Sequence, residues 1–178
     1  MRVTIERANL LKSLNHVHRV VERRNTIPIL SNVLIRAEGA NLAMKATDLD
    51  LEINESTAAM VEQAGATTVP AHLLYEIVRK LPEGGEVMLA TNPDGTSMTV
   101  ISGRSNFRLQ CLPQSDFPEL TAGTFTHSFR LNSTAIKGLI DKTQFAISNE
   151  ETRYYLNGIY LHTIESGGDL KLRAVATD

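Results

Sequence analysis

The chain carries one pattern of residues twice, with the two copies 126 positions apart. In the first copy, residues 3–6 read as a strand and are followed by apolar side chains at helical spacing, Leu10, Leu14, Val17 and Val21. In the second copy, residues 128–131 lead into the matching set Ile136, Ile140, Thr143 and Ile147. Residues 30–35 match 156–161 at the same offset, and each copy then reaches an Ala-Thr-Asp sequence, at 46–48 and 176–178. A repeat of this length indicates a duplicated domain and not a solenoid of short units.

The repeat also predicts the domain organisation. We place the first domain at residues 1–125, with a linker at about 112–125 in which Pro113 and Pro118 favour an extended path. Phe117 and Leu120 are expected to anchor this linker to a domain surface. Residues 126–178 then form about half of a second domain, and they end on an expected strand that needs partners. We therefore expect the 178 residues to be part of a longer molecule.

The order of elements predicts the fold class. Alternation of Leu49, Leu51 and Ile53 with polar residues predicts a strand with one solvated face over about 51–61. Residues 71–81 predict a second helix, which the turn residues at 82–85 end. Three further strands are expected at 86–91, 97–102 and 106–111. This order favours an α+β fold in which two helices pack together on one face of antiparallel sheets.

Composition excludes several classes of function. The net charge of −2 gives no global electrostatic reason to bind nucleic acid, so any such argument must rest on local clustering. A lone cysteine, Cys111, excludes an internal disulfide and most cysteine metal sites. No apolar run approaches the ~20 residues of a membrane span, so we expect no membrane partner. We expect a cytoplasmic protein without a cofactor.

The first helix is expected to carry a basic stripe opposite its apolar side chains. At ~100° per residue, Lys12, His16, Arg19 and Arg23 fall within a sector of roughly 60°, and Arg24 follows at the helix end. One interpretation is a solvated face that complements the helix dipole. The other is a row of phosphate contacts, which hold a nucleic-acid backbone without reading its sequence.

The other expected helices give weaker signals of the same kind. His72 and Arg79 share a face of the second helix, but Glu76 dilutes the charge. In the second copy, Lys137 shares a face with Asp141. Mixed faces of this kind suit loose contact with a polyanion better than tight binding.

The sequence offers few groups of side chains that could act together in catalysis. Asp48, Asp50 and Glu52 place carboxylates on one face of an expected strand and could bind a divalent cation. The recurrence of Thr-Asp at Thr177-Asp178 favours a turn role for Asp48 instead. Cys111 has no evident base beside it. The sequence therefore does not indicate an enzyme.

Residues 153–158 carry more large aromatic, apolar and charged side chains than a strand with only a structural role requires. The segment Arg153-Tyr154-Tyr155-Leu156-Asn157-Gly158 places an arginine, two tyrosines and a leucine beside a glycine. It is typical of a loop that enters a core strand with packed tyrosines. It is also consistent with the lip of an apolar groove for a partner peptide.

Several motifs together resemble one family. They are Thr26-Ile27-Pro28-Ile29-Leu30-Ser31-Asn32, Gly65-Ala66-Thr67-Thr68-Val69-Pro70-Ala71, Leu81-Pro82-Glu83-Gly84, Ser102-Gly103-Arg104-Ser105, Leu112-Pro113 with Asp116-Phe117-Pro118, and Arg153-Tyr154-Tyr155-Leu156-Asn157-Gly158. The resemblance is to the bacterial sliding clamps, the beta subunits of DNA polymerase III. It runs in register from residue 1 to residue 178, and the family implies that Gly-His-Arg would normally follow Asp178.

The resemblance implies a ring around duplex DNA. Members of the family have three similar domains per chain, and two chains close head-to-tail into a homodimer whose helices line the hole. The implied function is non-catalytic: the ring tethers DNA polymerase III and makes it processive. The DNA-facing residues would be Lys12, His16, Arg19, Arg23, Arg24, His72, Arg79 and Lys137.

The resemblance also implies two protein-binding surfaces. The pocket that binds peptide motifs of the polymerase III alpha subunit, the clamp loader and repair proteins would include Arg153, Tyr154, Leu156, Gly158 and Thr177. The ring interface would use edge-strand pairing at Arg104, Asn106, Phe107 and Arg108. Two rivals remain open from the residues alone: a free-standing peptide-binding module and a metal-dependent enzyme built on Asp48, Asp50 and Glu52.

Overall fold

The computed structural model describes residues 1–22, 26–120, 123 and 128–178. The chain divides into two compact units, Met1–Thr121 and Ala122–Asp178, and each is described by itself. The boundary that the repeat predicts, between residues 125 and 126, lies outside the described residues.

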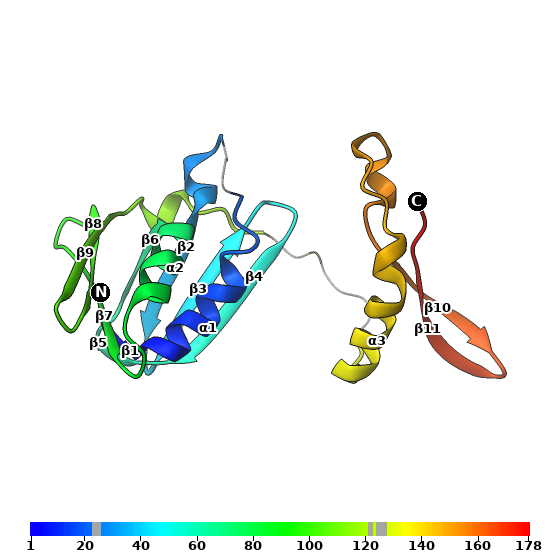
Figure 1. The fold of residues 1–178 in the computed structure, drawn as a ribbon, viewed down its shortest axis with the longest axis horizontal. Helices are drawn as coiled ribbons and strands as arrows, with labels where there is room; N and C mark the ends of the chain where they lie inside the picture. Colours follow the sequence, from blue (N-terminus) through cyan, green and yellow to red (C-terminus); the bar gives the residue numbers. More distant parts are fainter. Residues whose placement is uncertain (23–25, 121–122, 124–127) are drawn as a thin grey trace. The chain divides into compact units, whose positions relative to one another are not determined.

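The first unit contains two antiparallel sheets (Figure 1). The five-stranded sheet has the order β5 (Met60–Gln63), β1 (Arg2–Glu6), β7 (Glu86–Thr91), β8 (Ser97–Ser102) and β9 (Ser105–Gln110). The four-stranded sheet has the order β4 (Glu52–Ala58), β3 (Asn41–Thr47), β2 (Asn32–Glu38) and β6 (Gly65–Pro70). The strand expected over 51–61 is in fact two strands, because β4 pairs with β3 while β5 crosses to pair with β1.

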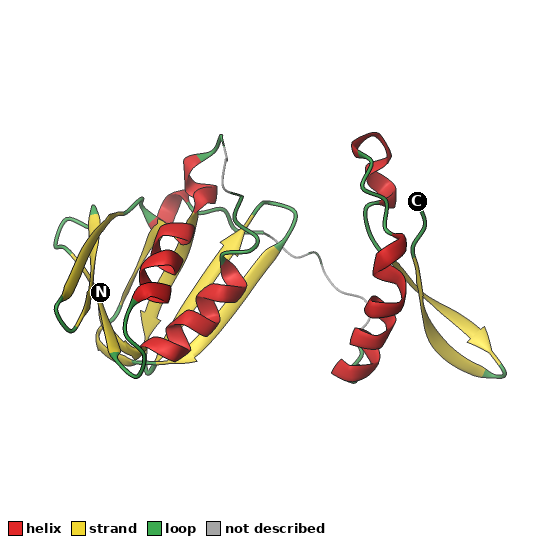
Figure 2. Ribbon diagram, viewed as in Figure 1, coloured by secondary structure: helices red, strands yellow, loops and turns green. Residues whose placement is uncertain are grey.

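Two helices, α1 (Arg7–Val17) and α2 (Ala71–Lys80), lie side by side across the strands (Figure 2). Their apolar side chains, with alternate residues of the strands, form one core that includes Leu10, Leu14, Leu74 and Val78. Arg7 ties the helices together, since its guanidinium donates to the carbonyls of Val78 at 3.1 Å and Arg79 at 2.7 Å. A cation at a helix C-terminus satisfies free carbonyls and complements the dipole. The α+β arrangement predicted from the sequence is confirmed.

Helix α1 is shorter than the apolar spacing predicts. It ends at Val17, so the expectation that one helix carries the stripe from Lys12 to Arg23 is wrong. After Val17 the backbone tightens into turns, in which the amide of Arg19 donates to the carbonyl of His16 and that of Val21 to His18. The ring of His18 stacks on Tyr75 of α2, with centroids 3.9 Å apart. This contact with α2 occurs where α1 ends. A contact between residues so far apart in the chain leaves no trace in helical periodicity.

The second unit repeats part of this pattern. Helix α3 (Ser133–Thr143) has the bounds of α1 moved by 126 positions, and Asn132 caps it by accepting from the amide of Thr134. Short 3-10 turns η3 (Gln144–Ala146) and η4 (Glu151–Leu156) lead to a hairpin of β10 (Tyr160–Ser166) and β11 (Asp169–Val175). Leu14 in α1 is fully buried, whereas its counterpart Ile140 in α3 is 39% exposed. One helix and one hairpin supply too few layers to enclose the equivalent core.

Candidate functional sites

The basic stripe of the first helix is smaller in the structure than in the sequence. Lys12 lies on α1 and Arg19 in the turn after it; both are exposed and make no ion pair with any described residue. His16 is engaged, because its Nδ1 lies 2.6 Å from Oε1 of Glu55 on β4. Arg23 and Arg24 lie outside the described residues. The structure therefore shows two unpartnered cations beside a paired histidine.

The predicted residues of the second helix are also partnered. His72 donates from Nε2 to the carbonyl of Val21 at 2.7 Å, which joins α2 to the segment after α1. Arg79 lies 2.7 Å from the carboxylate of Glu76, one turn earlier. In the second unit, Lys137 pairs with Asp141 on the same helix. Three of these predicted DNA-facing side chains thus have part of their charge or hydrogen-bonding capacity satisfied within the protein.

A shallow groove of about 460 Å³ runs between α1 and α2. Its lining includes Arg7, Lys12, Asn15, Tyr75 and Arg79, so three basic side chains border it. Because the cations are few and Arg79 is paired, the helix surface can attract a phosphate backbone without holding it tightly.

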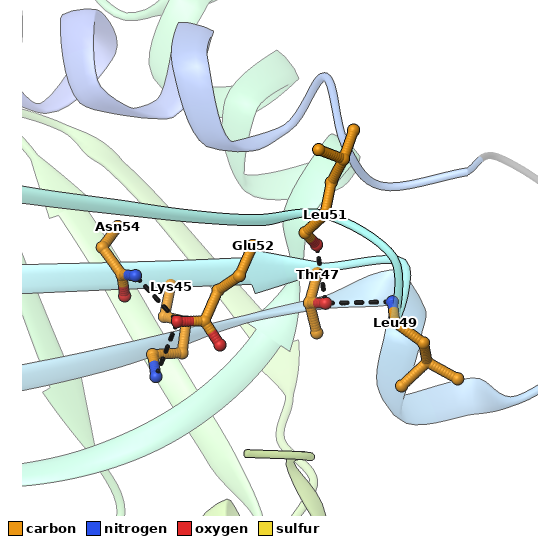
Figure 3. Close-up of polar contacts among 6 residues, drawn as sticks. All are labelled: Lys45, Thr47, Leu49, Leu51, Glu52 and Asn54. Carbon is orange, nitrogen blue, oxygen red and sulfur yellow. Dashed lines mark hydrogen bonds and ion pairs between the residues drawn. The ribbon is translucent and has the colours of Figure 1, made fainter. Parts of the chain in front are cut away.

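Two of the three carboxylates proposed for a metal site, those of Asp48 and Glu52, serve other roles. Asp48 accepts the amides of Asp50 and Leu51 at 2.9 and 2.7 Å, the turn role that the recurrent Thr-Asp favours. Asp48 and Asp50 precede β4 and do not share a strand face with Glu52, so that expectation is wrong. Figure 3 shows the carboxylate of Glu52 held by Asn54 and Lys45. The distances are 2.8 Å to the Asn54 amide and 3.1 Å to the Lys45 ammonium.

The hydrogen-bond and ion-pair partners of Glu52 favour the ionised form of its carboxyl group. The Asn54 amide has the largest effect and lowers the pKa of this carboxyl below its ordinary value of about 4.5. Burial opposes this effect, and the Lys45 ammonium lowers the pKa further. The pKa of Cys111 is raised, because burial disfavours the thiolate. Among the residues that the structure describes, no three His, Cys, Asp or Glu side chains gather as metal ligands.

The second unit contains a pocket of about 250 Å³ between η4 and the hairpin. It brings together three of the predicted partner-binding residues, Leu156, Gly158 and Thr177. Arg153 and Tyr154 do not line it: Arg153 is held by Glu150 at 2.7 and 2.8 Å, and Tyr154 is exposed. The lining residues that sequence reasoning missed are Tyr155, Ile159, Tyr160, Val175 and Ala176. Their closeness to Leu156 and Thr177 in the chain was the available signal.

The residues predicted for a ring interface lie at one edge of the five-stranded sheet. Strand β9 is last in the sheet order, and Arg104 lies in the turn that precedes it. Asn106, Phe107 and Arg108 are exposed on this strand. An edge strand offers unpaired backbone groups to a second chain.

Comparisons with known proteins cover both units. Residues 1–121 match the family described as "DNA polymerase III beta subunit, N-terminal domain", and residues 130–178 match its "central domain". Beta sliding clamps of Caulobacter vibrioides and Escherichia coli K12 are 54% and 42% identical to this chain over its whole length. The chain spans about half the length of these curated relatives, 48% and 47%.

Solved structures give the same result. A sliding clamp of Bartonella birtlesii bound to griselimycin has a TM-score of 0.94 at 58% identity, and the match covers 100% of this chain and 47% of that one. A Caulobacter crescentus beta sliding clamp has a TM-score of 0.96 at 54% identity, with the same coverage. Within the described residues, no helix is both long and apolar enough to cross a membrane. The chain belongs to the DNA polymerase III beta subunit family.

Proposed function

We propose that this chain is part of a sliding clamp that encircles duplex DNA and tethers the replicative polymerase in the bacterial cytoplasm. The observation that carries the proposal is the α1–α2 surface, where Lys12 and Arg19 are exposed and unpartnered while His16 and Arg79 are each paired with a carboxylate. A ring that slides needs attraction to phosphates but not a firm grip. In this proposal the DNA-facing set also includes His16, Arg23, Arg24, His72, Arg79 and Lys137.

The experiment that tests the DNA contact replaces Lys12 and Arg19 by alanine in a full-length clamp containing this sequence. Removing one phosphate contact lowers the slope of log affinity against log salt by about 0.9, so the slope of the double variant is expected to fall by about 1.8. Binding to a linear duplex is measured by fluorescence anisotropy from low to moderate salt. Arg36→Ala is the control, since Arg36 is exposed on β2, on the sheet face away from the helices, and should leave the slope unchanged. An unchanged slope in the double variant would remove Lys12 and Arg19 from the DNA contact.

We further propose that the pocket at Leu156, Gly158 and Thr177 binds peptide motifs of the polymerase III alpha subunit and the clamp loader, with Arg153 and Tyr154 at its rim. Apolar side chains around a small concave surface are the usual anatomy of a peptide site. The edge strand β9, with Arg104, Asn106, Phe107 and Arg108, is proposed as the homodimer interface. The protein would act without catalysis of its own. A free-standing peptide module has less support, because both units match clamp domains.

Leu156→Ala is expected to weaken binding of a polymerase-tail peptide about tenfold, because it removes from the pocket a central apolar side chain worth about 1.4 kcal/mol of binding free energy. Calorimetric titration of the full-length protein measures this change. Leu170→Ala on β11 is the matched control, since Leu170 is exposed and does not line the pocket. Equal affinity of the two variants would contradict the assignment of Leu156.

A further inference from the structure

The two copies of the repeat can be aligned through their hairpins. Leu34 faces Lys45 across β2 and β3, and Tyr160 faces Val175 across β10 and β11. Positions up to Tyr160 therefore correspond at an offset of 126, and positions from Val175 onward at 130, because the second hairpin is longer. Every residue that lines the pocket of the second unit thus has a counterpart in the first. The counterparts of Tyr155, Leu156, Gly158, Tyr160, Ala176 and Thr177 are Ile29, Leu30, Asn32, Leu34, Ala46 and Thr47.

In the first unit this counterpart surface is covered. Phe117 packs on Ile29 and Leu30, with Leu34 and Leu112 beside them, in an apolar cluster apart from the main core. Ile29 is only 9% exposed, whereas its counterpart Tyr155 is 71% exposed. The same place in the repeat is therefore filled in one copy and open in the other.

The covering segment is held by a short chain of hydrogen bonds. The side-chain amide of Asn32 donates to the hydroxyl of Thr68 at 2.9 Å, and that hydroxyl donates to the carbonyl of Leu112 at 2.9 Å. The 3-10 turn η2 (Gln114–Asp116) then turns the chain so that Phe117 points at the apolar surface. The counterpart of Asn32 is Gly158, which has no side chain to start such a relay.

The segment also leaves room beside it. A groove of about 600 Å³ lies between residues 114–119 and strands β2, β3 and β4, and its lining includes Leu34, Met44 and Phe117. An extended peptide could therefore follow the sheet once Phe117 no longer occupies the apolar surface.

We propose that the first unit contains a second peptide-binding site, built like the pocket of the second unit, and that residues 112–118 fill it from within the same chain. Phe117 is the anchoring side chain. The site takes an extended segment with one bulky apolar residue next to a proline. The comparison of the two pockets rests on the proposed function, in which the second unit binds partner peptides. The evidence that residues 112–118 cover this surface comes only from contacts within the first unit.

The test uses Phe117→Ala in the 178-residue chain and a synthetic peptide that copies residues 112–118, Leu-Pro-Gln-Ser-Asp-Phe-Pro. The readout is the methyl NMR shifts of Ile29, Leu30 and Leu34 during titration. In the unchanged chain we expect no saturable shift at these methyls up to the highest peptide concentration used. In the variant we expect a saturable shift with an apparent Kd at least tenfold below that concentration. A peptide with alanine in place of its phenylalanine should produce no such shift. Phe129→Ala, which changes an exposed phenylalanine of the second unit, should behave as the unchanged chain does.

A folded Phe117→Ala variant whose Ile29, Leu30 and Leu34 methyls ignore the peptide would overturn the proposal. So would binding that does not depend on the phenylalanine of the peptide. If Phe117→Ala does not fold, Phe117→Val replaces it, since this change shortens the covering side chain and leaves the hydrogen bonds of Thr68 to Asn32 and Leu112 in place. The same titration then decides. Loss of polymerase-peptide binding in Leu156→Ala tests the second unit separately, so the two proposals can fail independently.

Discussion

Leu14→Ala is expected to lower the free energy of unfolding of the first unit by about 2–5 kcal/mol. Leu14 is fully buried in the core that α1 shares with the two sheets. Its replacement removes apolar contacts and leaves a cavity that the surrounding strands can only partly fill, because protein interiors are closely packed. A loss of this size is a large fraction of the stability of a domain of this length. Urea unfolding of the 178-residue chain, followed by far-UV circular dichroism, measures it.

Two matched substitutions serve as controls for this prediction. Leu73→Ala lies on α2, where the side chain is 50% exposed, and is expected to cost about 0.5 kcal/mol or less. Ile140→Ala changes the counterpart of Leu14 in the second unit and should cost clearly less than Leu14→Ala, since Ile140 is 39% exposed. If Leu14→Ala cost no more than Leu73→Ala, the assignment of Leu14 to the centre of the core would be wrong.

A full-length clamp containing this sequence is expected to stay on circular duplex DNA at salt concentrations that abolish its binding to the same DNA after linearisation. Of the predicted DNA-facing residues that the structure describes in the first unit, only Lys12 and Arg19 lack a partner, and so few phosphate contacts give a weak, salt-sensitive affinity. Under the proposed function, retention on a circle then comes from the closed ring and not from contact strength. On linear DNA the ring can slide off an end.

The measurement loads the clamp onto nicked circular duplex, raises the salt concentration and follows the retained protein by gel filtration. A restriction cut at a single site supplies the linear DNA, and a mock-treated circle is the control. Nearly complete release after the cut, with retention on the circle, is the expected result. Equal retention on both forms would show that binding depends on affinity and would contradict encirclement.

The first helix shows what sequence periodicity predicts correctly and what it misses. The spacing of Leu10, Leu14 and Val17 correctly predicts a helix with one buried face, and the repeat predicts α3 at the same offset. The spacing continues through Val21, although the helix ends at Val17. The turn after it coincides with the stacking of His18 on Tyr75, a residue far away in the chain. Patterns within one segment cannot reveal such a contact.

The charged residues show the same limit. Sequence reasoning identified His16, Arg79 and Lys137 as basic, and the structure pairs them with Glu55, Glu76 and Asp141. Glu76 and Asp141 lie one helical turn away, so their pairing was foreseeable from spacing. Glu55 lies on a strand, and its approach to His16 depends on how α1 crosses the sheet.

The sequence by itself determined the duplication and the α+β order of helices and antiparallel strands. These features follow from local periodicity, turn residues and a long repeat, all of which are properties of neighbouring positions. Tertiary structure alone decided that Glu55 pairs with His16, where α1 ends, and which surface of the first unit Phe117 covers, the counterpart of the one that Tyr155 and Leu156 leave open in the second. These outcomes depend on contacts between residues distant in the chain, whose geometry is set by packing and not by sequence spacing.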